Sequence, residues 1–215
     1  MRKRFIVIVI FSIGLAFIEA VVVVYLRTIF YPNGFVFPLV GFISDERWQH
    51  FLGIEACRET ATLVVLFSSS WLFGNNFRTR LAYFLAIFAA WDIFYYVWLK
   101  ALLGWPSSIM EWDILFLIPF TWAAPVLAPV ILSSTMLIGA MLILNRECEG
   151  VPLRISRVFT HGFILIGILL VGHFCYAGMH VSRIDYKSYF NWPIFLGCEV
   201  AAIILMFKCM KKMPA

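Results

Sequence analysis

Long apolar runs separated by short polar segments constrain this chain more than any other feature of its sequence. The first run covers residues 5–26 and holds a single charged residue, Glu19. At about 1.5 Å per residue, such a run can cross the roughly 30 Å hydrocarbon core of a bilayer as a helix. With 63% hydrophobic residues the chain is more apolar than a soluble globule, whose apolar share is about 45–50%. The sequence therefore predicts an all-α, polytopic integral membrane protein.

Six of these runs are expected to form transmembrane helices within a single domain, residues 1–215. The predicted ranges are 5–26, 44–73, 81–103, 124–144, 158–177 and 192–207. Residues 35–43 are apolar but too few to span, which predicts a re-entrant or interfacial segment. Prolines break residues 114–129, so we expect a short half-helix over 114–120 before the fourth spanning helix.

Lys and Arg are distributed unevenly between the two sides of this topology. Eleven lie on the side of the chain termini, five lie on the opposite side, and Arg58 lies within a helix. Because cytoplasmic loops carry the excess of positive charge, both termini are predicted to be cytoplasmic and the protein to reside in a bacterial inner membrane. The net charge of +5 thus belongs to loops at the membrane surface. The expected partner is the lipid bilayer, and no nucleic-acid partner is expected.

The helix expected over 44–73 carries opposite charges on one face. Glu55, Arg58, Glu59 and Thr62 fall on a single stripe at helical spacing. An ionised side chain near the bilayer centre costs at least about 2.5–3.5 kcal/mol, so such residues face the protein interior and mark functional sites by default. The stripe therefore predicts a polar site in which Arg58 is the charge partner of the acids.

Ionisable side chains on five predicted helices share one depth range. Counted from the helix ends opposite the termini at about 1.5 Å per residue, they fall in the outer half of the bilayer or at its midplane. These candidate metal ligands are Glu19, Glu55, Glu59, Asp92, His173 and Glu199. Polar side chains one or two turns further along the same helix faces are expected to complete the site. They are Tyr95, Tyr96, Tyr176 and His180.

Five carboxylates against one arginine leave negative charge that protonation or bound cations must remove. Carboxylate and imidazole are ligands that iron, manganese and zinc accept, so the set predicts one or two divalent metal ions. The leading hypothesis is a metal-binding protein that acts as a metal-dependent membrane enzyme on a lipid-soluble or periplasmic substrate. Two alternatives stay open: a proton- or cation-coupled transporter whose acids titrate, and a non-catalytic subunit that associates with other membrane subunits.

Several features limit these hypotheses. The Glu-x-x-His pair of di-iron bundles, the His-Glu-x-x-His motif and the phosphate-binding loops do not occur, so no catalytic residue is assigned. Arg58 with Glu55 or Glu59 could form an ordinary ion pair, and His173 could be a neutral hydrogen-bonded histidine. Residues 91–95 (WDIFY) recur as residues 112–116 (WDILF), which is weak evidence for an internal duplication.

Overall fold

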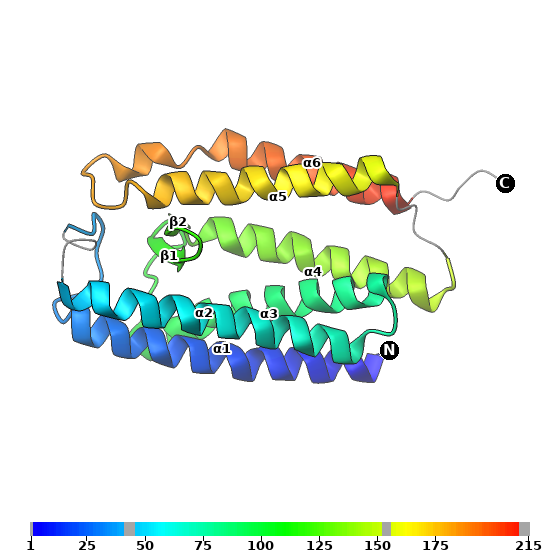
Figure 1. Cartoon of the computed structure of the whole chain (residues 1–215), viewed down its shortest axis with the longest axis horizontal. Helices are drawn as coiled ribbons and strands as arrows, with labels where there is room; N and C mark the ends of the chain where they lie inside the picture. The colour runs from blue at the N-terminus through cyan, green and yellow to red at the C-terminus, as the bar shows by residue number, and fades with distance from the viewer. Residues whose placement is uncertain (1, 41–45, 152–155, 211–215) are drawn as a thin grey trace.

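The computed structural model describes residues 2–40, 46–151 and 156–210. Over these residues the chain forms six long helices, one short 3-10 helix and one two-stranded hairpin (Figure 1). In chain order the elements are α1 (Arg2–Phe30), α2 (Glu46–Phe73), α3 (Phe77–Leu103), β1 (Trp112–Phe116), β2 (Trp122–Pro125), α4 (Leu127–Cys148), α5 (Arg157–Gly178), η1 (Tyr186–Tyr189) and α6 (Trp192–Met210).

Helix α3 is the centre of the bundle. It packs against α1, α2 and α4, while α5 and α6 lie side by side beyond α4 (Figure 1). The beginning of α1 and the end of α6 lie at the same end of the bundle, which we call the terminal end (Figure 1). The loop after α1, the β hairpin and the loop between α5 and α6 lie toward the other end, which we call the loop end.

Five of the described helices are long and apolar enough to cross a membrane: α1, α3, α4, α5 and α6, the last together with η1. Many large apolar side chains also face outward, including Leu72 at 83% and Ile168 at 63% exposure. Apolar surface of this extent is what lipid covers. The findings indicate a helical integral membrane protein and fit the all-α class. The prediction of six spans stays a prediction for α2, whose charged stripe lowers its hydropathy.

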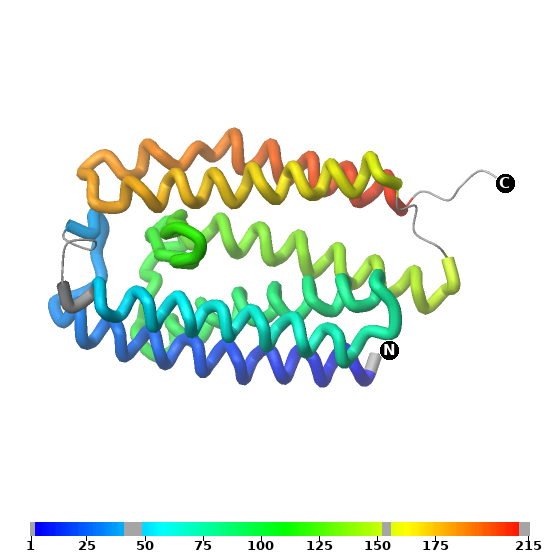
Figure 2. The backbone as a smooth tube through the Cα atoms, viewed as in Figure 1, coloured from blue at the N-terminus to red at the C-terminus, as the bar shows by residue number. Residues whose placement is uncertain are grey.

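The chain between α3 and α4 does not form the half-helix predicted over residues 114–120. It forms an antiparallel hairpin in which Trp112 pairs with Pro125 and Asp113 pairs with Ala124. Proline lacks the N–H that a helix needs, and the aromatic and branched side chains before Pro119 favour a strand. The segment is broken as predicted, but α4 begins only at Leu127. Figure 2 shows the hairpin curled tightly beside the beginning of α4.

The paired strands of the hairpin are largely buried in protein, since Trp112, Asp113, Ala123 and Ala124 are at most 6% exposed, whereas Phe120 in the turn is 64% exposed. Strand β2 packs against α5, and Gly178 at the end of α5 makes this approach possible. A Cβ atom at Gly178 would lie 1.8 Å from the carbonyl oxygen of Thr121 in the turn of the hairpin. The contact therefore requires a residue without a side chain, and it fixes the position of α5 against the hairpin.

Residues 31–40 form an irregular loop over the loop end of the bundle. The Leu39 N–H donates to the Val181 carbonyl at 2.9 Å, and the Ser182 hydroxyl donates to the Leu39 carbonyl at 2.9 Å. The loop after α1 is thus tied to the loop after α5. The predicted re-entrant or interfacial segment, residues 35–43, includes 41–43, which lie outside the described residues, and it stays a prediction.

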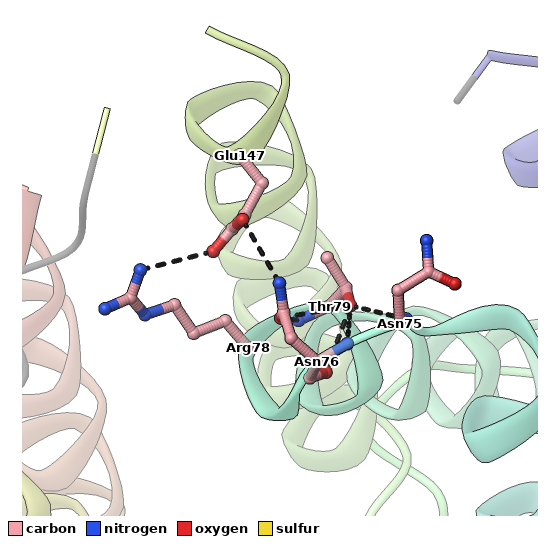
Figure 3. A network of polar contacts seen from close by, with 5 residues as sticks. All are labelled: Asn75, Asn76, Arg78, Thr79 and Glu147. Atoms are coloured by element: carbon pink, nitrogen blue, oxygen red, sulfur yellow. Dashed lines mark hydrogen bonds and ion pairs between the residues drawn. The ribbon is translucent and has the colours of Figure 1, made fainter. Parts of the chain in front are cut away.

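A polar network at the terminal end joins α3 to α4 (Figure 3). Asn76 caps α3 because its side chain accepts from the Thr79 N–H at 2.9 Å, while the Thr79 hydroxyl accepts from the Asn76 N–H at 3.1 Å. Glu147 of α4 accepts from the Asn76 side chain at 3.4 Å and pairs with Arg78 at 3.5 Å. The cap explains why α3 begins at Phe77, four residues before the predicted start.

Candidate functional site

Carboxylates from four elements line one cavity in the half of the bundle nearer the loop end. They are Glu19 of α1, Glu55 and Glu59 of α2, Asp92 of α3 and Asp113 of β1. Arg27 and Arg58 also line this acidic cavity, so it holds three more carboxylates than guanidinium groups. The volume of this cavity that the centres of water molecules can occupy is about 90 Å³. Since one water needs at least about 10–15 Å³ by this measure, the space suits several waters or a small ligand.

Arg58 lies between two carboxylates. Its Nε donates to Glu55 one helical turn earlier at 2.7 Å, and a terminal nitrogen of the same guanidinium pairs with Glu19 across the α1–α2 contact. The Thr62 hydroxyl also donates to Glu19, at 3.4 Å. Because two carboxylates share one guanidinium, this cluster keeps a formal charge of about −1 when both acids are ionised.

Arg27 and Asp113 form a second ion pair, which is buried. The guanidinium donates to the carboxylate at 2.9 Å, and the two residues are only 8% and 2% exposed. The Tyr95 hydroxyl donates to the other carboxylate oxygen of Asp113 at 3.4 Å. Burial raises the pKa of the Asp113 carboxyl above its ordinary value, while Arg27 and the hydrogen bonds act in the opposite direction.

Neither Glu59 nor Asp92 forms a direct ion pair with an arginine among the described residues, although Arg58 interacts with Glu59 at longer range. One oxygen of Glu59 accepts from the Leu117 N–H of the hairpin at 2.9 Å. One oxygen of Asp92 accepts from the Ser133 hydroxyl of α4 at 2.8 Å. Both donors are neutral, so these hydrogen bonds orient the two carboxylates without neutralising them.

A larger hollow of about 750 Å³ adjoins the acidic cavity at the loop end. We call it the vestibule, and Arg27, Tyr31 and Phe35 line both spaces. Its wall includes the charged side chains of Arg27, Glu111 and Lys187 and six aromatic side chains: Tyr31, Phe35, Phe37, Trp105, Trp112 and Tyr186. The Arg27 guanidinium carbon lies 4.2 Å from the Phe35 ring centroid and 3.8 Å from a Trp105 ring centroid. Arg27 therefore stands at the boundary between the vestibule and the acids.

The structure does not bring His173 or Glu199 to the acidic cavity. His173 Nε2 accepts from the Asn191 N–H at 3.1 Å, beside the Phe190 ring. Glu199 lines a separate crevice between helices. The depth of a residue along a helix can be counted from the sequence, but the face that each helix turns toward its neighbours cannot be inferred in this way. Helices α5 and α6 lie beyond α4, and α5 packs against β2 (Figure 1). Among the described residues none from α5 or α6 lines the cavity.

The polar side chains that were expected to complete the site are divided in the same way. Tyr95 and Tyr96 line the acidic cavity. Tyr176 is 48% exposed, and the ring of His180 stacks on Tyr189 at 3.7 Å between centroids, in the loop end of the α5–α6 pair. These two side chains lie outside the cavity.

Sequence reasoning missed Arg27 and Asp113 as site residues. Arg27 follows the first apolar run and was counted with the loop charges, although it lies within α1. A signal for Asp113 was present, because the WDIFY and WDILF pentads place Asp92 and Asp113 at equivalent positions. Both aspartates line the same cavity.

Within residues 2–40, 46–151 and 156–210 no group of three or more His, Cys, Asp or Glu side chains is placed to hold a metal ion. The divalent metal therefore remains a sequence-based prediction without geometric support. Fold and cavity together define a helical membrane protein with a buried acidic site. Compared with models of protein families, with curated proteins and with solved structures, the chain matches none.

Proposed function

We propose that this protein is an integral inner-membrane protein that binds a small organic cation in the acidic cavity, with access from the vestibule. One observation carries the proposal: Glu59 and Asp92 line a cavity with excess carboxylates and are held only by neutral donors. Carboxylates withdrawn from water need a positive partner or a proton. A cation that enters the cavity supplies the missing charge.

The proposal includes α2 as the sixth spanning helix. Its 28 residues extend about 42 Å at 1.5 Å each, enough to cross the hydrocarbon core. Its acids Glu55 and Glu59 are 6% and 7% exposed, whereas Phe67 and Leu72 on the same helix are more than half exposed. Such a helix keeps its charges against protein and presents apolar side chains to lipid.

The aromatic wall of the vestibule favours an organic cation over a metal ion. Cations with attached methyl groups are attracted to the faces of tryptophan, tyrosine and phenylalanine, and aromatic cages bind quaternary ammonium groups in this way. Arg27 already occupies this type of position between Phe35 and Trp105. With the termini cytoplasmic, the vestibule opens to the periplasm. Binding is the step that a transporter and an enzyme for such a cation share.

Thermal unfolding of the purified protein in lipid nanodiscs tests the proposal, with tetramethylammonium chloride as the probe. A ligand at 100 times its dissociation constant stabilises the folded state by about 2.7 kcal/mol. For a chain of this size that corresponds to about 5–11 °C in the unfolding midpoint. Sodium chloride at equal ionic strength is the control, and manganese and zinc chlorides form the metal arm.

Two variants remove a free carboxylate while keeping its size: Glu59→Gln and Asp92→Asn. Each is expected to weaken tetramethylammonium binding by about tenfold or more, as for the loss of a buried charge partner. Glu147→Gln, which removes an acid at the terminal end, should leave binding unchanged. A shift no larger than that of sodium chloride, or one that both cavity variants retain, would overturn the proposal. A shift with manganese or zinc alone would replace the organic cation by the predicted metal.

A further inference from the structure

A second, apolar space lies between the α3–α4 pair and the α5–α6 pair. This interhelical crevice has about 500 Å³ and extends toward the terminal end of the bundle. Its wall is almost entirely apolar and includes Leu85, Met136, Phe163, Ala202 and Met206. It shares no lining residue with the acidic cavity, so an inference from it does not rest on the proposed function.

Glu199 of α6 is an acidic side chain in this wall, which also includes Arg78, Thr135 and Thr160. It is 3% exposed, and neither carboxyl oxygen makes a hydrogen bond of normal geometry with the described residues. The hydroxyl of Thr135 on α4 is its polar neighbour and lines the same crevice. A single hydroxyl hydrogen can satisfy only one of the two oxygens. Buried polar groups normally have partners, so this carboxyl points to a ligand that supplies one.

The depth of Glu199 restricts what that ligand can be. At about 1.5 Å per residue it lies about 10 Å from the beginning of α6 and about 16 Å from its end, which is inside the hydrocarbon region. Phospholipid ester carbonyls lie at the headgroups, so an acyl chain would bring no acceptor to this depth. A carboxyl isolated in apolar surroundings is held neutral, and its O–H is then a donor that requires an acceptor.

We infer that the interhelical crevice binds a membrane-soluble quinone, with the Glu199 O–H donating a hydrogen bond to a quinone carbonyl. The apolar wall accommodates the body of such a molecule, which can enter laterally from the bilayer. With the Thr135 hydroxyl engaged by one carboxyl oxygen, the quinone carbonyl supplies an acceptor for the O–H of the other oxygen, which an acyl chain does not provide at this depth. The inference concerns binding and orientation of the quinone head and includes no electron transfer.

Binding can be measured in phosphatidylcholine nanodiscs, with decylubiquinone as the probe and decylbenzene as a control of similar size without carbonyls. Decylubiquinone should raise the unfolding midpoint, and decylbenzene should not. Glu199→Leu should weaken binding about tenfold, the effect of one lost hydrogen bond, whereas Glu199→Gln should stay within about threefold because its amide N–H still donates. Equal shifts from both compounds would overturn the inference, because the crevice would then accept any hydrocarbon.

A pair of phenylalanine variants tests the location. Ala202→Phe fills the crevice and should abolish the shift caused by decylubiquinone. Ile204→Phe, on the outward face of α6 at 47% exposure, should leave it unchanged. Infrared spectroscopy of the unsubstituted protein gives a readout that does not depend on the folding of any variant. The carboxylic C=O stretch should move on addition of decylubiquinone, and an unchanged stretch would contradict the hydrogen bond.

Discussion

Replacing Arg58 by methionine should destabilise the protein by about 3–5 kcal/mol, the usual cost of removing one partner from a buried ion pair. The Arg58 side chain is 23% exposed, and those of its partners Glu19 and Glu55 are 11% and 8% exposed. Methionine keeps much of the length of the side chain but leaves two carboxylates close together without a cation. At about 2–4 °C per kcal/mol, the unfolding midpoint should fall by about 6–20 °C.

The Arg78–Glu147 pair at the terminal end provides a matched comparison. A terminal guanidinium nitrogen of Arg78 lies 3.5 Å from a carboxylate oxygen of Glu147, and the Arg78 side chain is 37% exposed. Exposed pairs contribute about 0–1 kcal/mol, so Arg78→Met should cost no more than that. Adding Glu19→Gln to Arg58→Met should recover part of the loss, because it removes one of the two unpaired charges. The two substitutions should therefore be non-additive.

Unfolding in dodecylmaltoside micelles by titration with sodium dodecyl sulfate, followed by circular dichroism, measures these differences. The expected order of stability is the unsubstituted protein, Arg78→Met, the Arg58→Met/Glu19→Gln double variant and then Arg58→Met. If Arg58→Met costs no more than Arg78→Met, the guanidinium does not lie between two buried acids.

Three other substitutions can be measured in the same titration. Gly178→Ala should cost about 1–3 kcal/mol or more, because its Cβ would collide with the Thr121 carbonyl. Gly172→Ala is the control and should not destabilise the protein, because a Cβ there would meet nothing within 4 Å. Equal unfolding midpoints for the two variants would refute the close approach of Gly178 to Thr121. Glu199→Leu should stabilise the ligand-free protein by about 1–3 kcal/mol by removing an unsatisfied carboxyl, and a loss of stability would show that the carboxyl has a protein partner. Asp113→Asn should cost about 3–5 kcal/mol because it leaves a buried arginine without its counter-charge; a neutral effect would contradict that ion pair.

The helices were predictable because long apolar runs in lipid have few alternatives to helix. Their ends were less so. Helix α3 begins earlier than its apolar run because Asn76 and Thr79 form a cap, a signal that was present in the sequence. Helix α4 continues to Cys148 through Asn145 and Arg146, beyond the last apolar residue of its run. Polar residues at the membrane boundary do not end a helix by themselves.

The hairpin could not be distinguished from a helix by composition. Buried strands and buried helical segments are both continuous apolar runs, and residues 114–125 lie within a long run of this type. The site was predictable in part for a related reason. Counting residues along each helix gave the depth of each acid. Four of the acids predicted at a common depth, Glu19, Glu55, Glu59 and Asp92, do line one cavity. The order of the helices around the bundle, which places Glu199 elsewhere, is set by tertiary packing that the sequence pattern does not encode.

The reactivity of a cysteine at position 23 tests the acidic cavity most directly. Val23 lines the cavity one turn from Glu19, so Val23→Cys leaves every acid in place. In a background without the five native cysteines, a trimethylammonium methanethiosulfonate should modify it about tenfold or more faster than an anionic sulfonate analogue, because excess carboxylates concentrate cations. Ile18→Cys, on the outward face of α1 at 62% exposure, should react with neither. Equal rates for the two reagents at Val23→Cys, or no reaction with either, would contradict a common acidic cavity.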